Sequence, residues 1–301
     1  MITVEVESVS KSFGAVRAVD GVSFSVERGE VFGLLGPNGA GKTTIIRLVL
    51  DIFKPDRGRI LVFGGSLDAA RKERIGYMPE ERGLYQDIPL ERCLVYLASL
   101  KGVSPEEARR LSSAYLERFD LAEHKKKKVK ELSKGMQQKA QIIATLLHEP
   151  DLVIIDEPFS GLDPINTRVV KDLLRELADR GVTVIMSTHQ MHQVEEMCDR
   201  ILLIDQGRTL LYGPIGEIRR RFSGNAVLVR SPQALPEMEE VLQVEVHNAA
   251  YRLALAPGVS PNSILQALVA QQVPVDYFEI AAPTLDEIFV QVVQEGKAKN
   301  E

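Results

Sequence analysis

The chain has 301 residues, a length that suits one large domain together with a smaller one. Hydrophobic residues make up 45% of it and charged residues 26%, which is ordinary for a soluble globular protein, and no apolar run approaches the ~18 residues of a membrane-spanning helix. The net charge of −5 argues against nucleic acid as a partner, and the N-terminus lacks a signal-peptide pattern. We therefore expect a cytoplasmic protein with Cys93 and Cys198 as reduced thiols, acting at a membrane only through a separate partner.

The first two thirds of the chain predict an α/β core that a helical block interrupts. Residues 2–8 alternate apolar and polar side chains, as a half-buried strand does, and residues 22–30 predict a strand followed by a turn. From about 89 to 148 the apolar residues recur at helical spacing. The other expected strands are short apolar runs at 59–64, 74–79, 152–156, 182–187 and 200–205. Helical stretches separate the later runs, which indicates a parallel sheet covered on both faces.

A second unit is expected at 222–301, where ten acidic residues face only four basic ones. Its pattern predicts a strand, helix, strand, strand, helix and strand, at 225–230, 232–242, 243–248, 251–256, 261–272 and 275–281. This is the order of a small ferredoxin-like α+β domain, and a last helix is expected to begin near Thr284. We therefore predict a first domain at 1–221, with its helical subdomain at about 89–148, and an accessory domain at 222–301.

The stretch GPNGAGKTT, at 36–44, follows a hydrophobic strand and opens a helix, and it fits the P-loop pattern. Glycines let the backbone curl so that its N–H groups turn inward toward a phosphate, and the helix presents its positive end to the same anion. Lys42 can reach the β- and γ-phosphates, and the Thr43 hydroxyl can ligate Mg²⁺. A glycine-rich turn with a chance Lys–Thr is the alternative, which the strand context disfavours. The residues expected to hold the nucleotide here are Gly36, Asn38, Gly39, Ala40, Gly41, Lys42, Thr43 and Thr44.

A second pattern is LVIIDEP at 152–158, an apolar strand that ends in two adjacent carboxylates. Asp156 is expected near the Mg²⁺ bound at the P-loop, and Glu157 is then free to polarise an attacking water. An ordinary strand and turn would explain the segment if it stood alone. Upstream, LSKGM places Ser133 and Gly135 at a helix start, where they form either a simple N-cap or a further anion-binding pocket.

The ordered motifs GPNGAGKTT, LSKGM, LVIIDEP, SGLD and STH resemble those of the nucleotide-binding subunit of an ATP-binding cassette (ABC) transporter, over residues 1 to about 220. The resemblance implies that Phe13 stacks on the adenine, where the family more often has Tyr. It implies that His189 is the switch histidine that contacts the γ-phosphate, and that Asp163 lies in a loop communicating between two sites. Lys42, Glu157 and His189 are then the catalytic residues, and ATP and Mg²⁺ the ligands.

One position departs from the family: Glu80, in PEERGLY, stands where most members have a glutamine that senses Mg²⁺. A carboxylate could ligate the metal directly, so we assign Thr43, Glu80 and Asp156 to it. PEERGLY and the acidic 222–301 unit, with PTLDEIFVQVV, resemble a subgroup of sodium-extruding and drug-exporting systems. The segment from Glu80 to Leu100 is the candidate surface for coupling to the membrane partner.

The resemblance also implies a mechanism that needs two chains. Ser133 and Gly135 of one subunit cap the γ-phosphate held by Lys42 of the other, in a head-to-tail homodimer or a pair with a closely related ATPase subunit. Opening and closing of the pair would drive a separate transmembrane permease, on the inner face of the cell membrane. The alternatives are a soluble ABC ATPase acting in translation, repair or assembly, and a regulatory module with weak turnover. The single cassette, the lack of a basic stripe and the intact Glu157 favour the exporter subunit.

Overall fold

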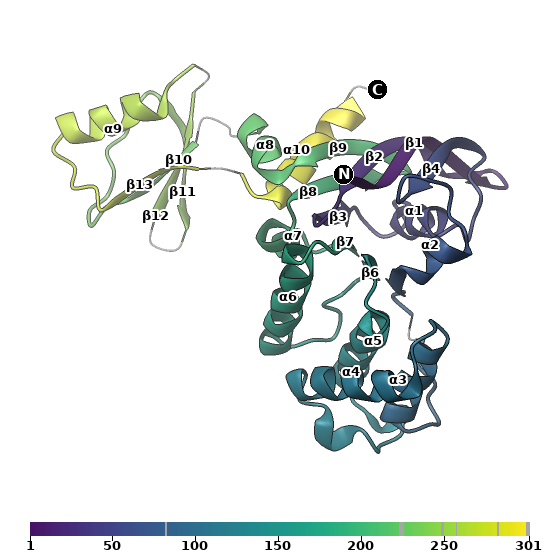
Figure 1. Cartoon of the computed structure of the whole chain (residues 1–301). Coiled ribbons are helices and arrows are strands. Elements are labelled where there is room, and N and C mark those ends of the chain that lie inside the picture. Colours follow the sequence, from purple (N-terminus) through teal and green to yellow (C-terminus); the bar gives the residue numbers. More distant parts are fainter. Residues whose placement is uncertain (82, 223–225, 248–249, 257, 282, 299–301) are drawn as a thin grey trace. The chain divides into compact units, whose positions relative to one another are not determined.

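The computed structural model describes residues 1–298 apart from 82, 223–225, 248–249, 257 and 282 (Figure 1). The chain divides into two compact units, Met1–Pro214 and Ile215–Glu301. The sequence pattern predicts this boundary between residues 221 and 222. Helix α8 (Ile215–Arg221) therefore belongs to the second unit rather than to the end of the first.

The first unit contains a three-stranded antiparallel sheet in the order β2 (Val16–Glu27), β1 (Ile2–Phe13) and β4 (Arg57–Val62). Both β1 and β2 are longer than the alternation at 2–8 and 22–30 suggested. Buried valines of β1 and β2 pack with α1 (Lys42–Val49) in the core that this sheet shares with the larger one.

The larger sheet has six strands in the order β5 (Ile75–Met78), β6 (Leu152–Asp156), β7 (Thr183–Thr188), β3 (Val31–Leu35), β8 (Arg200–Asp205) and β9 (Arg208–Pro214). The pairs from β5 to β8 are parallel, and β9 is antiparallel to β8. Every residue of β3, β6 and β7 is buried, as the solid apolar runs predicted for a sheet covered on both faces. The chain also forms α2 (Ala69–Glu73), α6 (Pro164–Asp179) and α7 (Met191–Met197) in this unit.

Between β5 and β6 lie the helices α3 (Leu90–Ser99), α4 (Pro105–Arg118) and α5 (Lys134–Leu146), which gather in one block in Figure 1. Two short 3₁₀ helices, η1 (Ala122–His124) and η2 (Val129–Glu131), connect α4 to α5. Helix α4 begins where the Ser104 hydroxyl accepts a hydrogen bond from the Glu107 amide, and α5 begins in the same way at Ser133. None of the helices in the described part of the chain combines the length and the apolar composition that a membrane span needs.

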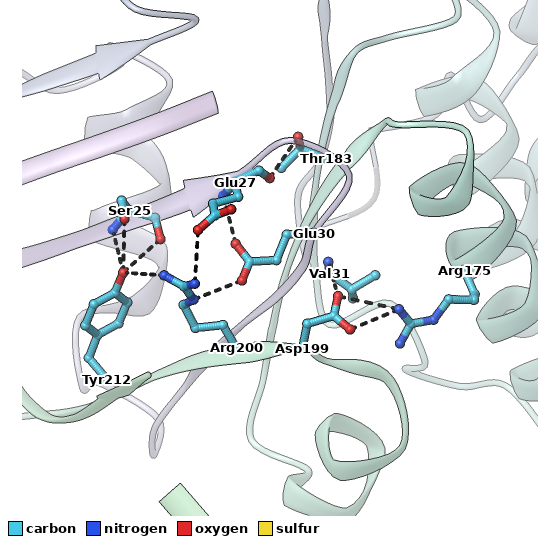
Figure 2. Close-up of polar contacts among 9 residues, drawn as sticks. All are labelled: Ser25, Glu27, Glu30, Val31, Arg175, Thr183, Asp199, Arg200 and Tyr212. Carbon is cyan, nitrogen blue, oxygen red and sulfur yellow. Dashed lines mark hydrogen bonds and ion pairs between the residues drawn. The ribbon is translucent and has the colours of Figure 1, made fainter. Parts of the chain in front are cut away.

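A polar network ties the two sheets together at the amino-terminal end of β3 and β8 (Figure 2). Arg200 forms ion pairs with Glu27 at 3.2 Å and with Glu30 at 3.0 Å. Arg200 also donates to the Tyr212 hydroxyl, which in turn donates to the carbonyl of Ser25 at 3.0 Å. These contacts fix one end of the parallel strands, and the P-loop follows β3 at the opposite end.

The second unit is a four-stranded antiparallel sheet in the order β11 (Val241–His247), β12 (Ala250–Leu255), β10 (Ala226–Arg230) and β13 (Tyr277–Ile280). Helix α9 (Pro261–Ala270) lies between β12 and β13 in the chain, and α10 (Leu285–Ala298) follows β13. This strand order and these directions are those of a split βαβ sheet, as the ferredoxin-like expectation requires.

The prediction of a helix at 232–242 is wrong. Residues 231–240 contain no helix, and β11 begins at Val241. Pro236 would stand inside such a helix, where a proline lacks the amide hydrogen and clashes with the preceding turn. Leu235 and Met238 instead pack directly against the apolar core that β10, β12 and α9 share. The segment thus covers the sheet without forming a helix.

Candidate active site

The sequence motifs meet at the carboxyl edge of the parallel sheet. Strand β3 leads into the P-loop, β6 ends at Asp156, and β7 ends at Thr188. The register places Leu35 beside Thr188 and Asp156 beside Ser187. Parallel strands end at the same edge, so the turns that follow them come together.

The P-loop has the backbone that the sequence predicted. Gly36, Gly39 and Gly41 have φ angles of 150°, 80° and 111°, a region that residues with a Cβ rarely adopt. A Cβ on Gly36 would lie 2.2 Å from the carbonyl oxygen of Ile204, and one on Gly41 would lie 2.5 Å from that of Ala18. Both positions therefore require glycine.

Lys42 lies across this loop. Its Nζ atom donates to the carbonyl of Gly36 at 2.7 Å and to that of Pro37 at 3.1 Å, and only 7% of the residue is exposed. Burial lowers the pKa of the Lys42 ammonium, and the carboxylates of Glu157 and Asp156 oppose that shift. The ammonium is thus held in the loop by neutral carbonyls, which a phosphate can replace as its partner.

The two carboxylates of LVIIDEP have different surroundings. Asp156 accepts hydrogen bonds from the Ser187 hydroxyl and, at 3.1 Å, from the Thr43 hydroxyl. The P-loop hydroxyl and the strand-end carboxylate therefore lie together. Proteins typically bind Mg²⁺ through a few such oxygen atoms, and water and phosphate supply its other ligands. The described residues hold no cluster of three or more acidic, histidine or cysteine side chains suited to a metal. The Thr43 hydroxyl and the Asp156 carboxylate fit Mg²⁺ that takes its other ligands from water and phosphate.

Glu157 is held by three donors. The Thr188 hydroxyl donates to Oε2 at 3.0 Å, while Oε1 accepts from the main-chain amide of His189 at 3.1 Å and contacts His189 Nδ1 at 2.7 Å. Glu157 has a φ angle of 53°, and its own amide donates to the Ser187 carbonyl at 2.9 Å. The turn after β6 therefore aims this carboxylate at the loop after β7, and the sequence had not singled out Thr188.

A cavity of about 610 Å³ contains the P-loop and both carboxylates. Its lining residues are Val16, Arg17, Ala18, Asn38, Gly39, Gly41, Lys42, Thr43, Thr44, Glu80, Asp156, Glu157, Gln206 and Gly207. Glu80 is among the lining residues, and its contact with Mg²⁺ stays a prediction. Residues 16–18 and 206–207 were not anticipated, because the start of β2 meets the distant turn between β8 and β9 there: a Cβ on Gly207 would lie 2.7 Å from the carbonyl oxygen of Ala18.

Five of the expected nucleotide-binding residues are not part of this cavity lining. Two of them, Gly36 and Ala40, are buried within the P-loop itself, and the other three are Phe13, Ser133 and Gly135. Phe13 is 44% exposed and packs edge-on against Phe53, with the ring centres 5.2 Å apart. Ser133 caps α5 by accepting from the Met136 amide at 3.2 Å. Gly135 lies against the loop that contains Asp163, because a Cβ there would be 3.0 Å from the Gly161 carbonyl oxygen. One chain by itself therefore does not bring Ser133 and Gly135 to its own P-loop cavity.

A glycine cradle with its lysine, beside paired carboxylates at the edge of a parallel sheet, defines a P-loop nucleoside triphosphatase. The family model "ABC transporter" matches residues 19–160, and "ATP-binding protein DrrA1-3-like, C-terminal domain" matches residues 213–293. An uncharacterized ABC transporter ATP-binding protein of Bacillus subtilis, YhaQ, is 38% identical over 96% of this chain and 97% of its own length. The daunorubicin resistance ATP-binding protein DrrA3 of Streptomyces coeruleorubidus is 31% identical over 99% and 98%.

A solved structure of the ATP-binding subunit of an ABC transporter is 35% identical and superimposes with a TM-score of 0.68, over 73% of this chain and 93% of its own. The chain belongs to the ABC transporter ATP-binding proteins, and its second unit is of the DrrA type. It binds ATP and is the ATP-hydrolysing subunit of an exporter-type ABC transporter, a class that works with membrane permeases and dimerises. The comparisons give no support to a role in translation, repair or assembly.

Proposed function

We propose that two such cassettes, two copies of this chain or one copy and a close relative, bind two ATP molecules head to tail. Each site would combine the P-loop of one subunit with Ser133 and Gly135 of the other. The supporting observation is that Ser133 is exposed at the start of α5 and absent from the lining of its own P-loop cavity. The first-turn amides of α5 are then available to the phosphate of another subunit.

Within each site we infer a division of roles among this chain's residues. Lys42 exchanges its bonds to the Gly36 and Pro37 carbonyls for the β- and γ-phosphates. Thr43, Asp156 and Glu80 hold Mg²⁺, which when bound neutralises charge on the phosphates. Glu157 accepts the proton of the attacking water, and its three donors keep the carboxylate in one orientation.

Three further assignments concern the adenine ring, the switch histidine and the loop before α6. Phe13 keeps an exposed ring beside the strand whose residues Val16 to Ala18 line the cavity, which supports stacking on the adenine. His189 lies 2.7 Å from Glu157 through Nδ1 and its side chain is 54% exposed, so the far side of its ring is available to a γ-phosphate. Asp163 caps α6 by accepting from the Asn166 amide at 2.8 Å, which supports a role in shaping the loop before α6.

The transmembrane permease is the remaining partner, and we infer that it holds this chain on the cytoplasmic face of the membrane. The segment from Glu80 to Leu100 exposes two tyrosines, Tyr85 at 49% and Tyr96 at 46%, with ring centres 5.4 Å apart. Leu100 is 63% exposed. Exposed aromatic and apolar side chains of this kind favour a protein contact.

Glu157→Gln tests the shared-site model, because it keeps the shape of the side chain and removes the base. At saturating ATP and Mg²⁺ this variant should elute as a long-lived dimer and turn over slowly. In the same background, Ser133→Asp should prevent the dimer, since aspartate still caps a helix but repels the γ-phosphate. A monomeric Glu157→Gln protein, or a dimer indifferent to Ser133→Asp, would refute the model. Co-purification with a membrane protein encoded beside this chain tests the permease contact.

A further inference from the structure

Helix α5 holds the turn that carries Glu80 through a buried glutamine. Gln141 is 4% exposed, and its Nε2 atom donates to the carbonyl of Pro79 at 2.9 Å and to that of Glu81 at 3.2 Å. The two carbonyls lie on either side of Glu80, so one amide group bridges the residue that reaches the nucleotide cavity. The Oε1 atom of Gln141 has no hydrogen-bond partner among the described residues. The contribution of this side chain therefore comes from its two donors.

The same helix holds the catalytic turn in the same way. Gln138 is 7% exposed, and its Nε2 atom donates to the carbonyls of Glu157 at 3.1 Å and Pro158 at 3.2 Å. Gln138 and Gln141 are three residues apart and therefore lie on one face of α5. The helix that begins at Ser133 is thus bonded to both turns whose carboxylates line the cavity.

Two more contacts fasten β5, the strand before Glu80, to α5 and to the turn that follows it. The Nε2 atom of His148 contacts the Ile75 carbonyl oxygen at 3.0 Å. A Cβ on Gly76 would lie 2.4 Å from the Thr145 carbonyl oxygen, so the strand lies directly on the helix backbone. With Gln141 these contacts run in order along both elements, from Ile75 and His148 at one end to Glu81 and Gln141 at the other. Strand β5 and its turn are therefore fastened to α5 and to the turn that follows it.

We propose that Gln141 is a positioning residue, which makes Glu80 follow α5 when Ser133 engages the nucleotide of the other subunit. This inference rests on the proposed function, in which Ser133 contacts that nucleotide and Glu80 contacts Mg²⁺. Ser133 displaces α5 when it binds the nucleotide of the other subunit. The Gln141 amide then carries this displacement to Glu80, which contacts the metal at the P-loop of its own subunit. The coupling segment, Glu80 to Leu100, begins at the residue that lies between the two bonded carbonyls.

The test compares Mg²⁺ titrations of ATPase activity at saturating ATP for Gln141→Met, Glu80→Gln and the double variant. Gln141→Met should raise the Mg²⁺ concentration at half-maximal activity by about threefold or more when Glu80 is present, and should have no effect in the Glu80→Gln background. Gln137→Met is the matched control, because Gln137 lies on the same helix and also donates to two carbonyls, those of Val129 and Leu132. It should leave the Mg²⁺ titration unchanged.

A shift of equal size with and without the Glu80 carboxylate, or an equal shift in the control, would overturn the proposal. The absence of any shift in Gln141→Met would also overturn it, provided that Glu80→Gln itself shifts the Mg²⁺ titration. A second measurement separates it from the metal assignment: amide hydrogen exchange at Glu80 and Glu81, with and without ATP, in the Glu157→Gln background. ATP should change this exchange when Gln141 is present and should not when it is Met. If Glu80→Gln titrates Mg²⁺ like the wild type while this loss is seen, the metal contact fails and the positioning role stands. Should Gln141→Met not fold, Gln141→Asn is the second variant: it keeps the amide group but shortens the side chain by one methylene, which moves the amide away from both carbonyls.

Discussion

Thr188→Val removes one of the three donors to Glu157 while keeping almost the same side-chain shape. Thr188 is 1% exposed, and its hydroxyl donates to Glu157 Oε2 at 3.0 Å and accepts from the Gln190 amide at 3.1 Å. A hydrogen bond to a charged group contributes about 1.5–3 kcal/mol. Two donors to the carboxylate remain, so we expect a loss near the lower end, which corresponds to about a tenfold fall in kcat. ATP affinity should change less than twofold, because Lys42 and the P-loop are untouched.

The assay is steady-state ATP hydrolysis, together with ATP binding by calorimetry. The matched control is Thr183→Val, at the other end of β7, where the buried Thr183 hydroxyl contacts that of Thr3 at 2.9 Å (Figure 2 shows Thr183 itself). The two variants should lose similar free energy of unfolding, about 1–2 kcal/mol. Only Thr188→Val should lose kcat. Equal kcat in both variants would show that the Thr188 bond does not orient the base.

Three other predictions follow from single contacts. Lys42→Ala should fold normally and lose ATP binding in calorimetry, because the loop amides keep their shape but the phosphates lose their ammonium partner; retained affinity would contradict the P-loop assignment. Burial lowers the pKa of His148 from 6.5, so the unfolded chain binds more protons as the pH falls through that value. The free energy of unfolding should therefore decrease from pH 7.5 to 5.5, and urea titrations of His148→Gln should show a smaller decrease; an equal one would refute the assignment. Arg118 and Glu176 form a two-bond ion pair between α4 and α6, with 31% and 45% of their side chains exposed. A double-mutant cycle to Met and Gln should give a coupling of only about 0.5–1 kcal/mol, and a value near zero would show that solvent screens the pair completely.

The sequence by itself determined the parts of the site that are local. Gly36, Gly41, Lys42 and Thr43 are neighbours in one turn, so their spacing fixes which backbone and which side chains face a phosphate. The apolar runs that end at Asp156 and before His189 likewise indicated parallel strands, whose ends share one edge. The helix expected at 232–242 failed because packing of Leu235 and Met238 and the presence of Pro236 outweighed the helical spacing of the apolar residues.

Only the tertiary structure decided which residues lie opposite the P-loop and the turns that follow β6 and β7. Val16 to Ala18 enter the cavity because β2 passes the P-loop, and Thr188 holds Glu157 because β7 lies beside β6. Gln141 bridges two carbonyls more than fifty residues away in the chain. A side chain that bonds a distant main-chain carbonyl leaves no pattern in the sequence, because any carbonyl can accept the bond and only the packing of helix on strand selects which one does.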